Sequence, residues 1–146
     1  MKHFRSRTIF SFLLLTLFLV SCKKDRDEQQ CQPNVAGISG NYKITSLQYK
    51  MTSTSTPVDY LVFMDDCEKD DLIILKADGA YQSNDIGLIC TPNNSNSGTW
   101  SISGNTIISD GVVAGTIETF DCNKLVCFLD DVNVPGDRFT LTVTRQ

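Results

Sequence analysis

Residues 67–101 constrain the fold of this chain more than any other stretch, because they contain a strong β-hairpin signal. Two short extended runs flank the pair Asp78-Gly79. Asp-Gly between such runs indicates a tight hairpin in which both turn residues have positive φ. A polar loop then leads to a further extended run that carries the only tryptophan, Trp100.

The same alternation of short strand and tight turn continues to residue 144. The pairs Gly104-Asn105, Asp110-Gly111 and Pro135-Gly136 separate the runs, and the last of them indicates a type II turn. We expect strands at residues 41–50, 72–76, 80–83, 98–101, 106–109, 112–120, 124–129 and 138–144. Residues 58–64 are apolar, but the run is too short to distinguish a strand from one or two helical turns. Since no helical stripe of useful length follows residue 21, we predict an all-β fold, a small antiparallel up-and-down β-barrel of about eight strands.

The first expected strand changes face along its length. Tyr42 and Ile44 share one face, whereas Leu47 and Tyr49 share the other. A β-bulge or sharp bend near Thr45 would produce this change, and strands that curl around a barrel often need one.

The first 21 residues are typical of a secretory signal peptide. Lys2, Arg5 and Arg7 precede an apolar run of about a dozen residues, which is shorter than the roughly 20 that span a bilayer. The run ends in the residues LVSC at 19–22, a match to the bacterial lipobox, in which the cysteine is acylated. We therefore expect residues 1–21 to be a lipoprotein signal peptide and Cys22 to anchor the chain in a lipid bilayer. An ordinary signal peptide with an incidental cysteine is the alternative.

Residues 23–30 are charged or polar and contain no apolar side chain. Such a segment buries too little surface to order itself, so we assign residues 22–39 to the lipidated cysteine and a flexible tether, and residues 40–146 to the barrel domain. Lys23 differs from the aspartate that retains lipoproteins in an inner membrane. We expect an outer-membrane lipoprotein that faces either the periplasm or the cell surface.

Charge and histidine content exclude several classes of function. Without Lys2, Arg5 and Arg7 the chain keeps 10 of its 13 basic residues against 17 acidic ones, a formal charge of about −7. This charge argues against a nucleic acid or an anionic membrane surface as partner. The single histidine, His3, lies in the signal peptide, so no His-based triad or metal site is available in the mature chain. The sequence also lacks a GxSxG elbow and a glycine-rich phosphate loop, and we expect no enzymatic activity and no cofactor.

Five cysteines remain after Cys22, an odd number for an oxidising compartment. We expect a Cys67–Cys90 disulfide, because the hairpin between these residues brings the ends of the segment together. Closing a loop of about 24 residues stabilises a domain by roughly 3 kcal/mol in the chain-entropy model.

The other three cysteines leave one pair and one free thiol. Cys127 shares a face with Leu125 and Leu129, which indicates a small buried apolar residue. The remaining pair is Cys31 and Cys122. A metal site at Cys122 and Cys127 is disfavoured, because CxxC spacing and a histidine partner are missing.

Five acidic side chains cluster within seven residues: Asp65, Asp66, Glu68, Asp70 and Asp71. Ca²⁺ takes six to eight oxygen ligands, and such a cluster offers them. The glycine and the closing glutamate of an EF-hand loop are absent, however. We expect a solvated loop and no metal, with a Ca²⁺ site as the alternative.

Several motifs in order resemble the lipocalin-like domain of bacterial outer-membrane lipoproteins. They are Gly40-Asn41-Tyr42-Lys43-Ile44, Cys67 with Asp70-Asp71-Leu72, Asp78-Gly79-Ala80-Tyr81, Cys90, and Gly98-Thr99-Trp100. The resemblance covers residues 40–144. It departs from the family at Tyr42, where many members have tryptophan.

The resemblance implies a small β-barrel on a lipid tether. Because a barrel of about eight strands can hold one small ligand in its mouth, we expect a non-catalytic binding module for a small apolar or amphipathic ligand. The candidate ligand-lining side chains are Trp100, Tyr42, Phe128 and Phe139. The alternative is a barrel filled by these side chains, whose loops bind a protein or a glycan. The sequence indicates no oligomeric state.

Overall fold

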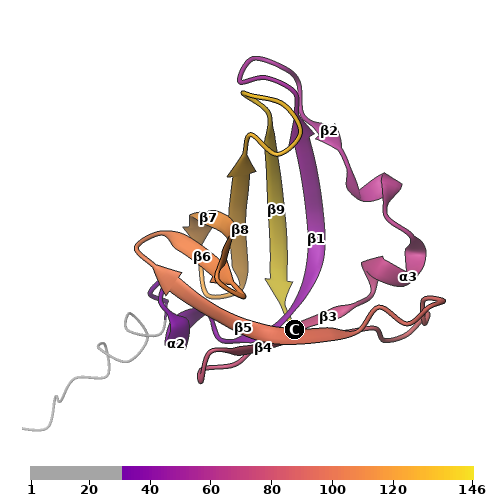
Figure 1. Ribbon diagram of the computed structural model, residues 1–146, viewed down its shortest axis with the longest axis vertical. Coiled ribbons are helices and arrows are strands. Elements are labelled where there is room, and N and C mark those ends of the chain that lie inside the picture. The colour runs from indigo at the N-terminus through magenta and orange to yellow at the C-terminus, as the bar shows by residue number, and fades with distance from the viewer. Residues whose placement is uncertain (1–30) are drawn as a thin grey trace, which may run out of the picture.

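The computed structural model describes residues 31–146 (Figure 1). The strands are β1 (Gly40–Lys50), β2 (Val58–Asp59), β3 (Leu72–Leu75), β4 (Ala80–Asn84), β5 (Asn96–Ser103), β6 (Thr106–Ser109), β7 (Val112–Phe120), β8 (Lys124–Asp130) and β9 (Arg138–Arg145). The helical segments are α2 (Val35–Ile38), the 3-10 turn η1 (Leu61–Phe63) and α3 (Asp66–Lys69).

The strands form one antiparallel sheet that closes on itself. The sheet order is β2-β1-β3-β4-β5-β6-β7-β8-β9, and β1 also pairs with β9. All strands except the two-residue β2 therefore follow one another around a ring in chain order. In Figure 1, β1, β8 and β9 run together while β4 and β5 cross below them. The predicted all-β, up-and-down, ring-like fold is confirmed.

The expected bulge in β1 is present. The register between β1 and β9 shifts between Ile44 and Ser46, which leaves Thr45 as the extra residue. The Thr45 hydroxyl lies 2.9 Å from the hydroxyl of Thr144 on β9. Because of the bulge, Tyr42 and Leu47 both face the interior of the ring although their sequence positions differ in phase.

The turn at Asp78-Gly79 differs from its prediction. Gly79 has a φ of +86°, but Asp78 does not have positive φ, and the Gly79 N–H donates to the Lys76 carbonyl at 3.1 Å. A longer turn therefore joins β3 to β4. The two-residue turn with both φ values positive is Asp110-Gly111, at 49° and 81°, since aspartate tolerates this conformation better than most residues.

The ambiguous segment 58–64 contains both kinds of structure. It begins with the short strand β2, which pairs with the end of β1, and continues into the single turn η1. Pro135-Gly136 behaves as a type II turn, with Gly136 at +90° and a bond from the Asp137 N–H to the Val134 carbonyl.

The domain begins before residue 40, its predicted start. Cys31 forms a disulfide with Cys122, and the Asn34 side chain accepts a hydrogen bond from the Gly37 N–H to cap α2. Ile38 at the end of α2 is completely buried. Assigning residues 31–39 to a flexible tether was therefore wrong, because a covalent bridge and a buried side chain hold them on the barrel. The predicted signal peptide, Cys22 and residues 23–30 lie outside the described residues.

The two ends of the ring differ. Beside α2 lies a core cluster that consists of Ile38, Tyr42, Trp100, Ile117, Leu125, Cys127 and Val143. The antiparallel order places the β3–β4, β5–β6 and β7–β8 turns at this closed end. The opposite, open end carries the other connections: the segment joining β1 to β3, the β4–β5 loop, the β6–β7 turn and the β8–β9 loop. Among residues 31–146, no helix is long and apolar enough to cross a bilayer.

Candidate functional site

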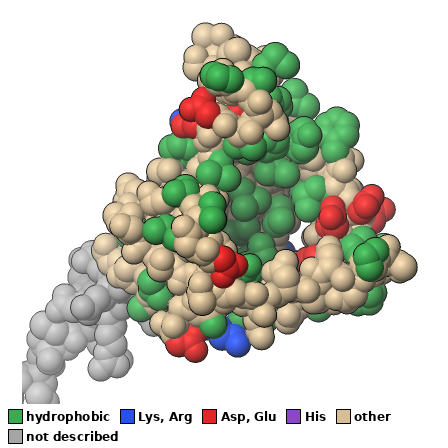
Figure 2. All heavy atoms as spheres, viewed as in Figure 1, with side chains coloured by type: hydrophobic (Ala, Val, Ile, Leu, Met, Phe, Trp, Pro, Cys, Tyr) green, Lys and Arg blue, Asp and Glu red, His purple; other side chains and the backbone are tan. Residues whose placement is uncertain are grey.

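The interior of the ring contains an apolar cavity above the core cluster. It has a volume of about 340 Å³, and it lies within the ~300–1,000 Å³ range typical of ligand pockets. Its lining residues are Ile73, Leu75, Tyr81, Ser83, Asn96, Trp100, Ile107, Ser109, Ala114, Leu125, Cys127, Leu141 and Val143. Figure 2 shows a hollow on this face of the molecule that is lined with hydrophobic side chains.

A second hollow of about 330 Å³ continues the first toward the open end. It is lined by Leu47, Ala114, Cys127, Phe128, Leu129, Val132, Phe139 and Leu141. Ala114, Cys127 and Leu141 line both hollows, so the two parts meet. The interior therefore contains two adjacent apolar hollows.

Three of the four predicted lining residues border these hollows. Trp100 is only 4% exposed, lies in the deeper hollow, and donates from Nε1 to the Lys76 carbonyl at 2.9 Å. Phe139 and Phe128 border the outer hollow. The Phe128 ring also stacks beneath the Arg138 guanidinium, 3.8 Å from its centroid. Whether any of these side chains contacts a ligand stays a prediction.

Tyr42 instead lies at the closed end of the barrel. Together with Arg145 and α2 it forms a hydrogen-bonded group that we call the plug. Its hydroxyl donates to the Ile38 carbonyl at 2.6 Å and accepts from Arg145 Nη2 at 2.9 Å. The same nitrogen of Arg145 donates to the carbonyls of Gly37 and Ser39. Tyr42 is completely buried and does not line either hollow.

An aromatic cluster lies at the open end, and it is not among the residues predicted from the sequence. The Tyr49 ring lies 4.7 Å from Phe139, the Tyr60 ring lies 5.0 Å from Phe139, and Tyr60 lies 5.2 Å from Phe63 (ring centroids). The face change in β1 turned Tyr49 inward, which was a usable signal. No sequence signal indicated Tyr60 and Phe63, because their positions in the cluster depend on how β2 and η1 fold against β1.

Asp137 holds the β8–β9 loop beside this cluster. Asp137 is only 1% exposed. Its carboxylate accepts hydrogen bonds from the Tyr49 hydroxyl and from three backbone N–H groups, those of Val132, Asn133 and Val134. Burial opposes ionisation, but these donors outweigh it and lower the pKa of Asp137 below its usual 3.8. The loop is therefore built around an ionised carboxylate.

Exposed large hydrophobic side chains gather at the open end. They are Met51, Val58, Tyr60, Val62, Phe63, Leu88, Ile89, Val112, Val113, Val132 and Val134. All of them lie on open-end loops, on β2 and η1, or at the start of β7. Clustering of exposed apolar side chains on one part of a surface marks a site of interaction or ligand entry.

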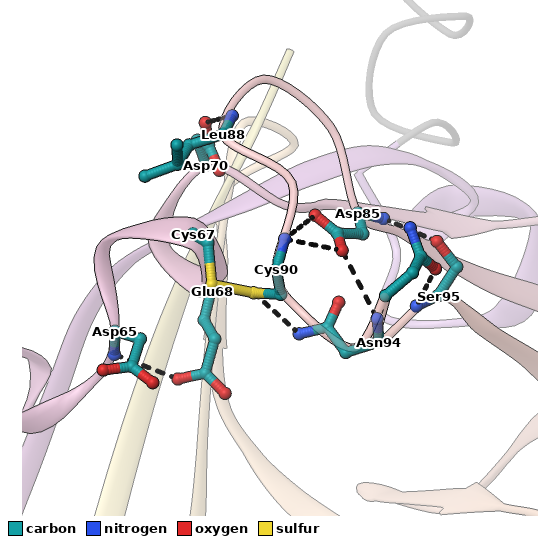
Figure 3. Close-up of a disulfide and its surroundings, with 10 residues drawn as sticks. Asp65, Cys67, Glu68, Asp70, Asp85, Leu88, Cys90, Asn94 and Ser95 are labelled. Carbon is teal, nitrogen blue, oxygen red and sulfur yellow. Dashed lines mark hydrogen bonds between the residues drawn. A yellow bond between two sulfur atoms is a disulfide. The ribbon is translucent and has the colours of Figure 1, made fainter.

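The Cys67–Cys90 disulfide joins α3 to the β4–β5 loop (Figure 3). Asp85, which is buried, accepts hydrogen bonds from the N–H groups of Cys90 and Asn94 and so shapes that loop. Both disulfides predicted from the sequence, Cys67–Cys90 and Cys31–Cys122, are present.

The acidic cluster beside this bridge is divided among local roles. Asp65 and Glu68 form a capping box for α3, Asp66 pairs with Lys69 at 2.8 Å, and Asp70 accepts from the Leu88 N–H at 2.9 Å. Burial, and then the negative charge of Asp85, raise the pKa of Asp71. Within the described part of the chain, no three His, Cys, Asp or Glu side chains are grouped to hold a metal ion. The geometry therefore offers no support for the alternative of a Ca²⁺ site.

Cys127 is the free thiol of the described residues and lines both hollows. Burial raises the pKa of the Cys127 thiol from 9.0 to about 11. It is therefore protonated at neutral pH and contributes to the cavity as a small apolar side chain.

Fold and site together define a class: a small closed β-sheet whose apolar interior opens at one end. A family model of the lipocalin-like domain matches residues 38–127, more than half of the chain. The chain belongs to the lipocalin-like domain family, and this membership points to a binding module for small hydrophobic ligands. No curated protein and no solved structure matches it. The matched region ends within β8, whereas β9, which pairs with both β8 and β1, completes the ring.

Proposed function

We propose that this protein is a membrane-tethered, non-catalytic lipoprotein that holds a small apolar or amphipathic ligand in its barrel cavity. The observation that carries the proposal is the pair of adjacent apolar hollows inside the ring, which Tyr42 and Arg145 close at one end. Burial of apolar ligand surface against these walls supplies about 25 cal/mol per Å² before the costs of association.

The position of the tether supports an orientation for the mouth. Cys31 is bonded to Cys122 on the β7–β8 turn, which lies at the closed end. A chain acylated at Cys22 would thus join the barrel at its closed end after a short charged segment. We place the open end away from the membrane that holds the anchor, in the periplasm or at the cell surface of an outer membrane.

Ligand binding is tested with the chain from residue 23 to residue 146, which contains every described residue. Trp100, the only tryptophan, reports on the deeper hollow, and a panel of fatty acids, alcohols, amines, sterols and short glycans is titrated against it. We expect saturable quenching by an apolar chain. Ala114→Phe places a bulky ring where the two hollows meet and should weaken that binding without changing the charge. Absence of any response from the whole panel would overturn the proposal.

The anchor is tested separately on the full chain. Intact-mass analysis of the membrane fraction should find a chain that begins at an acylated Cys22. A soluble chain, or cleavage at another residue, would overturn the tether and leave the cavity proposal standing.

A second candidate function is an interaction module that binds a protein or glycan through its loops. The exposed hydrophobic side chains at the open end favour it, with Phe63 at 69% and Val112 at 69% exposure. Glycan or protein binding that survives Ala114→Phe, together with no response to apolar chains, would favour this second function.

A further inference from the structure

The carboxylate of Asp110 lies at the border of the cavity. Asp110 follows the lining residue Ser109, and the hydroxyl of the lining residue Tyr81 donates to Asp110 Oδ2 at 3.1 Å. Gly98 pairs with Tyr81. It lies two positions from each of the lining residues Asn96 and Trp100, so it is on the same face of β5 as they are. A Cβ atom on Gly98 would clash with both carboxylate oxygens of Asp110. The carboxylate therefore occupies the space on the interior face of β5 that a side chain at residue 98 would fill.

This carboxylate is held in place as an ion. Its Oδ1 accepts from the Thr99 N–H at 2.7 Å and from the Thr99 hydroxyl at 3.2 Å. The Thr99 N–H, helped by the Tyr81 hydroxyl, lowers the pKa of Asp110 below its usual 3.8. A carboxylate has about four acceptor positions, and these bonds use three, so Oδ2 keeps an acceptor position for a further donor.

Asp110 has no basic partner among the described residues that line the cavity. Neither hollow is lined by a lysine or arginine of residues 31–146. Arg138 lies over the ring of Phe128 at the edge of the outer hollow, but it pairs with Asp130 at 2.6 Å. Arg145 is held at the closed end by Tyr42 and the Gly37 carbonyl. Figure 2 shows acidic side chains around the apolar hollow and a basic side chain beside the acidic ones above it. A carboxylate head group at the mouth would therefore face a fixed negative charge with no cation within the cavity lining.

We propose that the cavity selects aliphatic amphiphiles whose head group is a primary ammonium, bound by Asp110 at the mouth, and discriminates against fatty carboxylates. This inference rests on the proposed ligand-binding function. An ammonium group donates up to three hydrogen bonds, and a charge-assisted bond to a carboxylate is about twice as strong as a neutral one. The aliphatic chain of such a ligand extends past Tyr81 and Ser109 toward Trp100.

The test compares three probes with the same ten-carbon chain: decylamine, decanol and decanoate. Each is titrated below its micellar concentration into the chain of residues 23–146, with Trp100 fluorescence and calorimetry as readouts. We expect decylamine to bind at least about tenfold more tightly than decanoate, with decanol between them. Asp110→Asn should weaken decylamine about tenfold and leave decanol within about twofold.

Two further variants separate a local contact from bulk charge. Asp78→Asn removes the same charge from the closed end, where the Asp78 side chain accepts from the Ala80 N–H, and should leave the preference unchanged. Gly98→Ala keeps the charge but displaces the Asp110 carboxylate, so it should weaken decylamine and spare decanol. Circular dichroism and thermal melting verify that each variant is folded.

The outcomes distinguish this inference from the function on which it rests. Binding of decanoate as tight as that of decylamine, or equal losses in Asp110→Asn and Asp78→Asn, would overturn the selectivity and leave the cavity function in place. If decanol and the wider panel also fail to bind, both are overturned.

Discussion

Arg145 donates a hydrogen bond to the hydroxyl of Tyr42, 103 positions away in the sequence, and this contact closes one end of the barrel. The arginine lies near the end of β9 and the tyrosine near the start of β1, at the position where the two strands pair. The Arg145 guanidinium also lies 5.4 Å from the Tyr42 ring centroid and donates to two carbonyls at α2. The Arg145 side chain therefore joins the last strand, β9, to the first strand, β1, and to α2 beside the core.

Tyr42→Phe should destabilise the domain by about 1–3 kcal/mol, because it removes one partner each from the Ile38 carbonyl and from Arg145 in a buried site. Urea denaturation followed by circular dichroism measures the change. Tyr81→Phe is the matched control, since its hydroxyl bonds to the exposed Asp110, where water can replace it. Equal losses in the two variants would contradict a special role for the plug.

The sequence predicted the strands well because their turns and alternation are local signals. The bulge at Thr45 followed from a face change within a single strand, and the Cys67–Cys90 bridge followed from a hairpin. By contrast, the hairpin signal at Asp78-Gly79 did not distinguish a two-residue turn from a longer one, since both place glycine at positive φ.

The candidate site was less predictable because it depends on contacts between distant segments. Trp100 was identified as a lining residue, but Tyr42 became part of the plug through Arg145, whose partners are far away in sequence. Asp110 carried no local sign of its position over Gly98, because that contact requires β4, β5 and β6 to be aligned. Tyr60 reaches the aromatic cluster only because β2 pairs with the end of β1.

Asp137→Asn should lower the free energy of unfolding at neutral pH. It should also make that free energy depend less on pH in the acid range. The folded pKa of Asp137 lies below its usual 3.8, so ionisation stabilises the folded state fully above the unfolded value. That contribution is lost as the pH falls through the lowered folded pKa. Urea midpoints between pH 2.5 and 7 should therefore fall less steeply in the variant than in the wild type.

Asp130→Asn provides the control for this loop. Asp130 pairs with Arg138 in an exposed ion pair, and such pairs contribute about 0–1 kcal/mol. The midpoint at pH 7 should change less than in Asp137→Asn. A larger change in the control would show that the buried carboxylate does not organise the loop.

The two disulfides should differ in their contribution to stability. They close loops with sequence separations of 23 and 91 residues, and the chain-entropy model assigns about 3.5 and 4.6 kcal/mol to them. Replacing Cys31 and Cys122 by serine should thus cost roughly 1 kcal/mol more than replacing Cys67 and Cys90. Urea unfolding of the two double variants measures the difference, and peptide mapping without reductant checks that the other bridge remains. An equal cost, or the reverse order, would contradict this ranking.

The thiol of Cys127 should react slowly with a polar thiol reagent while the barrel is folded. With a pKa of about 11, its thiolate fraction continues to rise steeply between pH 9 and pH 10, whereas a thiol with the ordinary value of 9.0 is already levelling off. We expect the labelling rate of the chain of residues 23–146 to rise nearly tenfold over that pH unit, and by two orders of magnitude or more on unfolding in urea at pH 8. Cys127→Ala, which leaves both disulfides intact, is the control and should not be labelled without reductant. Because Cys127 lines both hollows, a ligand that fills them should slow the labelling further. Fast labelling of the folded chain would instead place this thiol outside the apolar interior.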